Sequence, residues 1–130
     1  MSNAVLKGVM SPEISFLNHL PNGTQMKLDT KCAYNVKYAK DLHCRAEMSI
    51  ETRSKEAPEQ FYIKVKLVGI FNYSEGADKD LLHLETFKIL FPYARALVST
   101  ITANAGLPPI ILPEINIEGQ NIYRIEKGNL

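Results

Sequence analysis

The segment Leu42–Thr52 constrains the fold most, because apolar and polar residues alternate along it without a break. The apolar positions are Leu42, Cys44, Ala46, Met48 and Ile50. A period of two over this length predicts a β-strand with one buried face and one face in water. The segment Gln60–Tyr73 has the same period, so a second strand is expected after a turn at Ser54–Glu59.

Two further segments with a strand-like pattern precede this pair, at residues 25–38 and 4–16. Four sequential strands joined by short turns predict an antiparallel β-meander. After Gly76 the apolar spacing becomes helical. A first helical piece is expected around Leu81–Phe87 and a second from Pro92 to Gly106, since proline suits a first helical turn and glycine a C-terminal cap. The expected fold is α+β, a four-stranded antiparallel β-meander with a long helix packed on one face, in the order β-β-β-β-α with an extended C-terminal segment.

The composition limits the classes of protein to which the chain can belong. A length of 130 residues, with 45% hydrophobic and 22% charged, predicts a single globular domain over residues 1–130. The net charge of +1, without a basic block, argues against nucleic acid as a partner. Apolar runs are shorter than the roughly 20 residues of a membrane span. No secretion signal is recognisable. We therefore expect a cytoplasmic protein that does not insert into membranes.

Residues that carry catalysis or hold cofactors are not grouped in this sequence. The seven glycines form no phosphate-binding loop, and the three histidines stand far apart. Cys32 and Cys44 fall on apolar positions of neighbouring strands. A cross-strand disulfide is conceivable there, but buried reduced thiols are the stronger expectation. We therefore expect a protein that is not an enzyme and that has no cofactor and no metal site.

An apolar, proline-rich segment, Leu107–Pro113, follows the expected helix and is called the strap below. Its three prolines exclude a helix and favour extended backbone. Loops lie at protein surfaces, so an apolar loop needs something to cover it. Two interpretations stay open. The strap covers the core of the sheet, or it forms the wall of a groove that accepts apolar peptide.

The heptapeptide Ile89–Arg95, ILFPYAR, resembles the SecB family of protein-export chaperones. Further segments resemble the family in the same order along the chain, namely Glu13–Phe16, Met26–Asp29, Lys64–Phe71 and Leu112–Ile117. The resemblance implies a four-stranded antiparallel sheet with helices on one face, assembled as a homotetramer that is a dimer of dimers. It also implies ATP-independent holding of unfolded polypeptides in long hydrophobic grooves.

The chain departs from the family at features that serve the SecA motor. Family members that deliver cargo to SecA carry acidic residues on the sheet surface and a disordered tail with a basic motif. Here Glu13 keeps an acid, but Leu17 and Lys64 replace acids, and the sequence ends at Leu130 without such a tail. The C-terminal helix of the family is shortened too, since Gly119 interrupts it. Because Lys64 should repel a basic partner, SecB-like client binding is expected and delivery to SecA is not.

The expected function is that of a chaperone for unfolded or preprotein chains, with a role in protein export. The alternative is a dedicated chaperone or interaction module for one partner, such as an antitoxin. The residues expected to line a peptide-binding groove are Val68, Ile70, Phe91, Tyr93, Leu107, Ile110, Ile111 and Leu112. A core position is the alternative for Phe91 and Tyr93. The residues expected between copies of the chain are Ile63, Val65, Leu67, Leu97 and Ile101.

Overall fold

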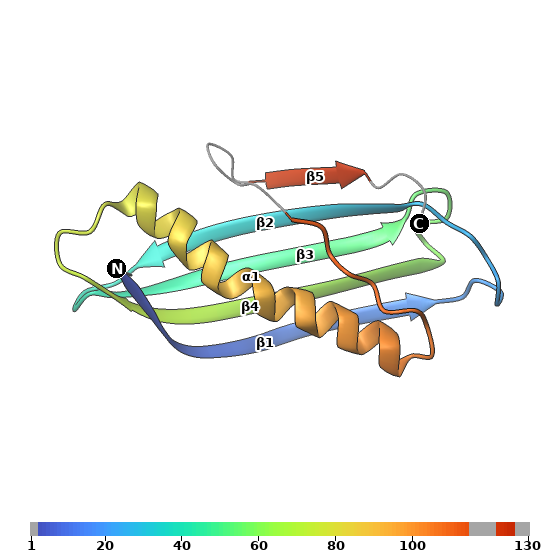
Figure 1. The fold of residues 1–130 in the computed structure, drawn as a ribbon, viewed down its shortest axis with the longest axis horizontal. Helices are drawn as coiled ribbons and strands as arrows, with labels where there is room; N and C mark the ends of the chain where they lie inside the picture. Colours follow the sequence, from blue (N-terminus) through green and yellow to red (C-terminus); the bar gives the residue numbers. More distant parts are fainter. Residues whose placement is uncertain (1–2, 115–121, 127–130) are drawn as a thin grey trace.

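The computed structural model describes residues 3–114 and, for the backbone, residues 122–126. The described chain forms an antiparallel sheet with one long helix across one face (Figure 1). The elements are β1 (Ala4–Asn18), β2 (Leu28–Tyr38), β3 (His43–Ser54), β4 (Phe61–Tyr73), α1 (Lys79–Asn104) and β5 (Ile122–Glu126). The α+β class, the first four antiparallel strands and the long helix predicted from the sequence are thereby confirmed.

The strands lie in the order β1-β4-β3-β2-β5, which corrects the expected meander. β2, β3 and β4 pair in succession through short turns, whereas β1 pairs with β4 and not with β2. This is the order of a Greek key read from its last strand. The turn signals in the sequence identify consecutive strands but not their pairing. β4 therefore has a hydrogen-bonded strand on each side, β1 and β3.

The helix α1 begins and ends at well-defined caps. The Asp78 carboxylate accepts the Asp80 N–H at 2.8 Å, which satisfies one of the free donors of the first turn. At the other end, Leu107 N–H donates to the Thr102 carbonyl and Gly106 N–H to the Ala103 carbonyl, each at 3.1 Å. This double closure is a Schellman motif, and Gly106 supplies its left-handed residue at φ +83°. The predicted glycine cap is confirmed.

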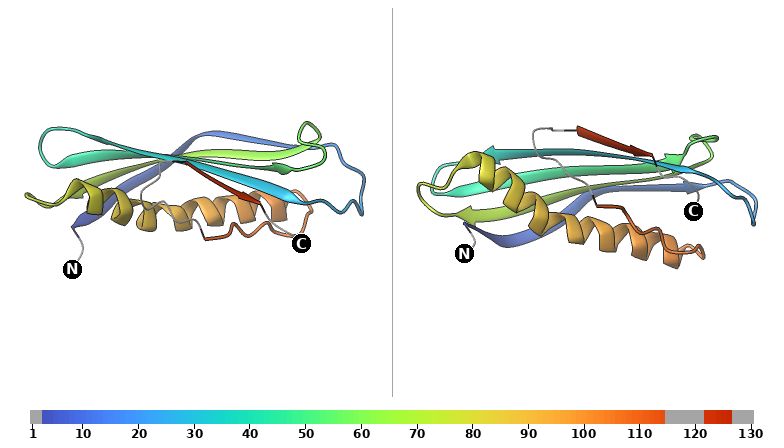
Figure 2. Two further views of the ribbon diagram at one scale, coloured as in Figure 1. Left: turned by 90° about the horizontal axis from the view of Figure 1, so that it is seen from above. Right: turned by 45° about the horizontal axis from the view of Figure 1, so that its top comes forward.

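Pro92 lies inside α1, which corrects the expectation of two helical pieces. The proline ring is exposed, and the Lys88 carbonyl that would accept its missing N–H lies on the solvent side of the helix. Meanwhile the apolar stripe runs through the position unbroken, with Phe87, Phe91 and Ala94 all buried against the sheet. Packing of this stripe therefore outweighs the local cost of proline, about 3 kcal/mol in a helix interior. Figure 2 shows that α1 changes direction in its middle part.

The core fills the space between α1 and the facing side of the sheet. The Tyr34 hydroxyl reaches across this layer and hydrogen-bonds the Thr86 hydroxyl at 2.5 Å. Gly69 lies under the helix, where an added Cβ would come within 3.1 Å of the Leu90 side chain. These contacts show that even-numbered residues of β2 and odd-numbered residues of β4 face α1, and their neighbours along each strand face away.

Both cysteines are free and buried in this core, as the sequence predicted. Cys32 pairs with Ile50 and Cys44 with Tyr38, so the two thiols lie six residues apart along β2 and β3. At about 3.3 Å per residue that separation is far beyond disulfide reach. Burial raises the pKa of the Cys32 thiol to about 12. Cys32 therefore acts as a small apolar side chain.

The fifth strand was not expected. The resemblance implied a shortened C-terminal helix in this part of the chain, whereas residues 122–126 form β5, antiparallel to residues 29–33 of β2. Residues 115–121 and 127–130 lie outside the described part of the chain, so Gly119 and Ile115–Ile117 are not placed.

Candidate client-binding surface

The strap leaves the end of α1 and folds back beside it. Ile110 N–H donates to the Thr102 hydroxyl at 2.9 Å, and that hydroxyl itself donates to the Val98 carbonyl. Leu112 is 2% exposed and joins the core, whereas Ile111 is 57% exposed. The first interpretation of the strap, a cover over the core, therefore holds at Leu112, and the groove wall stays a prediction. Leu112 covers the core, while Ile111 presents an apolar side chain to the outside.

Two residues predicted for the groove belong to the core instead. Phe91 is buried and stacks on Phe87, with ring centroids 5.3 Å apart, while the Arg95 guanidinium lies over its ring. Leu112 is closed in by the same core. Neither side chain is available to a client without disturbing the fold, so the predicted groove is corrected at both positions.

Val68 and Ile70 lie on the wrong side of the sheet for the predicted groove. Gly69 faces α1, so its two neighbours along β4 point away from the helix and from the strap. Val68 is also completely buried. A strand reverses its face at every residue, and the sequence pattern showed both parities to be apolar without showing which one α1 covers.

Tyr93 lies on a different flank of α1 from the strap. Thr102, which holds the strap, is nine residues further along, or two and a half turns at 3.6 residues per turn. The two side chains therefore leave the helix axis in opposite directions. Tyr93 is 48% exposed, and Leu97 and Ile101 lie half-buried near the same flank. The predicted groove therefore does not form one continuous surface. Leu107, Ile110 and Ile111 form a strap surface, and Tyr93, Leu97 and Ile101 form a separate flank surface.

The flank surface continues onto β1, which the sequence analysis did not include. Figure 1 shows α1 crossing the sheet diagonally and ending beside β1. On the helix side of β1, Val9 and Ile14 are exposed and Phe16 is half-buried. β1 runs for 15 residues and forms an edge of the sheet, with no described strand beyond it. A long edge strand presents unpaired backbone N–H and C=O groups with which another chain can pair.

The start of β1 is tied to α1. The Glu85 carboxylate accepts the backbone N–H groups of Asn3 and Ala4 at 3.2 and 2.9 Å. Further along, two register shifts in the β1–β4 ladder, at Leu6/Gly8 and Met10/Glu13, interrupt the pairing. Such bulges increase the twist of an edge strand. β1 therefore stays paired with β4 despite the bulges, and no described strand pairs with its other edge.

The strand residues predicted between copies of the chain are not at the surface. Ile63, Val65 and Leu67 are at most 2% exposed and lie beneath α1. This burial corrects their assignment, because the chain's own helix already covers the strand face. Leu97 and Ile101 keep an accessible side and stay in the prediction. The sequence analysis left out β1, where apolar residues occupy both parities of the strand.

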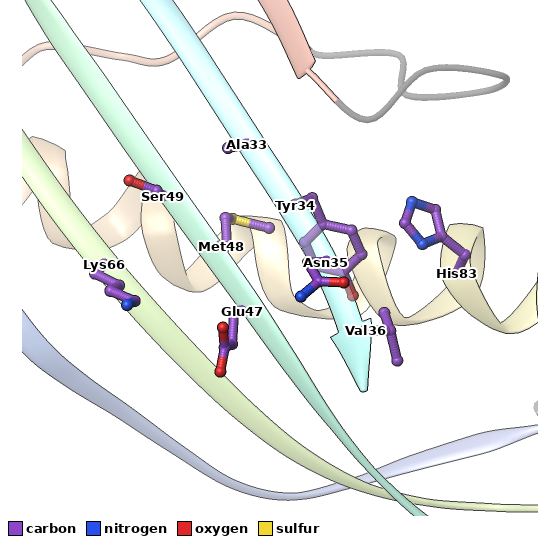
Figure 3. A pocket seen from close by; sticks show the side chains of 9 residues that line it. All are labelled: Ala33, Tyr34, Asn35, Val36, Glu47, Met48, Ser49, Lys66 and His83. Atoms are coloured by element: carbon purple, nitrogen blue, oxygen red, sulfur yellow. The ribbon is translucent and has the colours of Figure 1, made fainter. Parts of the chain in front are cut away.

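The chain also has a depression of about 510 Å³ with a mixed polar and apolar lining, away from the strap (Figure 3). Its lining includes Asn35, Glu47, Ser49 and Lys66 from the strand faces that point away from α1, with His83 of α1 at one end. Among the described residues, no three histidine, cysteine or acidic side chains gather as metal ligands. In the same part of the chain, no helix is long and apolar enough to cross a membrane.

The family model described as preprotein translocase subunit SecB matches residues 7–128. The chain belongs to the SecB family. Among relatives, the SecB protein-export protein of Caulobacter vibrioides is 30% identical, over 80% of this chain and 65% of its own length. That of Neorickettsia sennetsu is also 30% identical, over 89% and 76%. This chain thus spans about two thirds to three quarters of these SecB proteins.

Two further matches extend the SecB likeness beyond these bacterial export proteins. An uncharacterized protein of Methanocaldococcus jannaschii is 34% identical, over 87% of this chain and 79% of its own length. A SecB-like chaperone of Mycobacterium tuberculosis, solved with a ChAD peptide from the HigA1 antitoxin, superposes with a TM-score of 0.69 at 16% identity. That match covers 87% of this chain and 91% of the other. It establishes a shared fold, in agreement with the sequence-based expectation.

Proposed function

We propose that this SecB-family chain is an ATP-independent chaperone that holds unfolded polypeptides on the strap surface. The observation that carries the proposal is Ile111, an exposed aliphatic side chain on a strap that Leu112 and the Ile110–Thr102 hydrogen bond fix to the core. Apolar contact is non-directional and scales with buried area, so such a surface accepts many sequences. The prolines of the strap restrict its backbone before binding, which lowers the entropy cost of capturing a client.

We further propose that the flank surface joins copies of the chain. Ile14 and Val9 of β1, with Leu97 and Ile101 of α1, would meet the same residues of a second copy across a two-fold axis. Pairing of two β1 edges would also satisfy the open backbone groups of that strand. A dimer of dimers is the assembly proposed for the whole protein, and light scattering at micromolar concentration tests it. A monomer there would contradict the proposal.

The proposed setting is the cytoplasm, with a role in protein export as the family description suggests. Delivery of cargo to SecA is not part of the proposal, because Lys64 and Leu17 stand where SecA-dependent members carry acids. No catalytic step is proposed, and no nucleic acid partner.

A dedicated role is the second candidate. It is supported by the solved relative, which is a SecB-like chaperone bound to an antitoxin peptide. The two candidates differ in breadth of clients. Suppression of aggregation of several unrelated unfolded proteins, without nucleotide, supports a general chaperone. Protection of a single partner supports the dedicated role, and protection of none contradicts both.

A further inference from the structure

Arg95, the last residue of the ILFPYAR segment, lies on the flank of α1 that holds the strap. It precedes Thr102 by seven residues, which is about 20° short of two full turns, so the two side chains leave the helix in nearly the same direction. The Thr102 hydroxyl accepts the N–H of Ile110 in the strap. Figure 1 shows the strap running back beside α1 from the C-terminal end of the helix. The Arg95 side chain therefore leaves α1 toward the strap.

The guanidinium group of Arg95 is held in place, yet no group of the described chain binds it. Its Cζ atom lies over the Phe91 ring, 5.1 Å from the ring centre, and that ring stacks on Phe87 in the core. The residue is half-buried, and its buried Nε atom has no hydrogen-bond partner. Within the described chain, the side chain forms no hydrogen bond and no ion pair. A positioned group with only N–H donors therefore lacks an acceptor.

The strap itself offers few main-chain donors to a client. Three of its seven residues are prolines, which have no N–H group. The N–H groups of Leu107 and Ile110 already donate to Thr102 of α1. An unfolded client, in contrast, carries a carbonyl at every residue, and a carbonyl that leaves water without finding a donor costs free energy. An apolar strap that binds extended chains therefore needs a donor from a neighbouring element.

We propose that Arg95 is a client-binding residue of the strap surface, and that its guanidinium group donates hydrogen bonds to main-chain carbonyl groups of an extended client. This inference rests on the proposed function and names the part of the client that is recognised. Ile111 would contact apolar side chains of the client, while Arg95 would bind the backbone between them. Because every residue has a main-chain carbonyl, this contact adds affinity without restricting the sequence of the client.

The surroundings of Arg95 favour a neutral carbonyl over a carboxylate. The guanidinium lies between the Phe91 ring and an apolar strap, and a carboxylate loses more hydration than a carbonyl does on such a surface. Glu114, which ends the described part of the strap, is exposed and forms no ion pair with Arg95. Its charge would repel a client carboxylate but not a carbonyl.

The test uses the full chain and the blocked, uncharged peptide acetyl-Ser-Leu-Thr-Leu-Ser-Leu-Thr-Leu-amide with a neutral fluorophore, followed by fluorescence anisotropy. A second peptide carries the α-hydroxy acid in place of each leucine, so that esters, whose carbonyls are weaker acceptors, replace half of the amides. We expect Arg95→Met to bind the amide peptide about tenfold more weakly than the wild type does. Because the acceptor is neutral, that difference should be nearly the same at low and physiological salt.

The preference for the amide over the ester peptide isolates the role of Arg95. The ester peptide also lacks N–H groups, but this loss is the same for every variant. We expect the preference to be about threefold or more larger in the wild type than in Arg95→Met, with Arg95→Lys between them because lysine keeps the charge without the planar fork. The matched control is Lys79→Met, which removes a cation 4.7 Å from the centre of the Tyr38 ring at the other end of α1. This variant should bind both peptides as the wild type does.

Urea unfolding of each variant separates binding from folding. An amide preference that is equal in the wild type and Arg95→Met overturns the proposal, and a lower stability of that variant would then give Arg95 a structural role only. An effect of Arg95→Met that is confined to a peptide with glutamate in place of serine and that disappears in salt also overturns it, because the acceptor would then be a carboxylate. Ile111→Ser is measured alongside. Weaker binding by Ile111→Ser with normal binding by Arg95→Met would overturn the role of Arg95 alone, whereas normal binding by both variants would overturn the strap surface as well.

Discussion

Replacing Ile111 by serine tests the strap surface directly. The side chain is 57% exposed, so a client can still cover somewhat more than half of it. Full burial of an isoleucine side chain is worth about 1.5–3 kcal/mol, and the exposed fraction therefore about 0.9–1.7 kcal/mol. We expect Ile111→Ser to weaken client binding about four- to eighteen-fold. The measurement is a titration of a labelled, permanently unfolded protein, followed by anisotropy.

Two companion variants separate binding from folding. Leu81 is 56% exposed at the other end of α1, so Leu81→Ser removes the same apolar area away from the strap and should leave client binding unchanged. Leu112→Ala removes a core side chain and should lower the free energy of unfolding by about 2–5 kcal/mol in urea, without weakening client binding by the folded protein. Equal loss of binding in Ile111→Ser and Leu81→Ser, or normal binding by Ile111→Ser, would refute the reasoning.

Three further changes test the core and the flank. Gly69→Ala would place a Cβ within 3.1 Å of Leu90, and we expect overpacking to lower the free energy of unfolding by about 1–3 kcal/mol in urea titrations; an unchanged midpoint would contradict the close approach. Because the pKa of Cys32 is higher in the folded than in the unfolded chain, the contribution of this thiol to stability should be constant below pH 9 and fall by up to about 1.4 kcal/mol per pH unit above it; Cys32→Ala should reduce the slope of stability against pH in that range, and an identical slope would exclude this thiol as a source of it. Ile14→Lys places a charge on the open β1 edge, so light scattering should show smaller assemblies, whereas an unchanged mass would remove this edge from the interface.

The strands and caps were predictable because their signals are local. The alternation from Leu42 to Thr52 defines a strand face wherever the strand is placed, and Gly106 suits a left-handed cap in any helix. The pairing of β1 with β4 depends on contacts between distant segments, which no local pattern encodes. The prediction of two helical pieces around Pro92 was wrong for the same reason. The apolar stripe from Phe87 to Ala94 stabilises one continuous helix because it packs against the sheet.

The binding surface was predicted less well than the fold. Apolar character identified Ile111 and Leu112 together, but only the three-dimensional arrangement shows that one faces outward and the other inward. Likewise, Val68 and the strap share composition but lie on opposite sides of β4. Sequence spacing along a strand fixes relative orientation, and the absolute direction depends on which face α1 covers.

The opposite directions of Tyr93 and Thr102 have a thermodynamic consequence. If copies associate through the flank of α1 that carries Tyr93, while clients occupy the flank that holds the strap, neither event buries groups that the other requires. The two equilibria are then unlinked. Dilution that dissociates the assembly would leave the intrinsic client affinity of each chain unchanged, and binding capacity would scale with the number of chains, not with the number of assemblies. Any gain in the apparent affinity of the assembly for a long client would come from the raised local concentration of neighbouring straps.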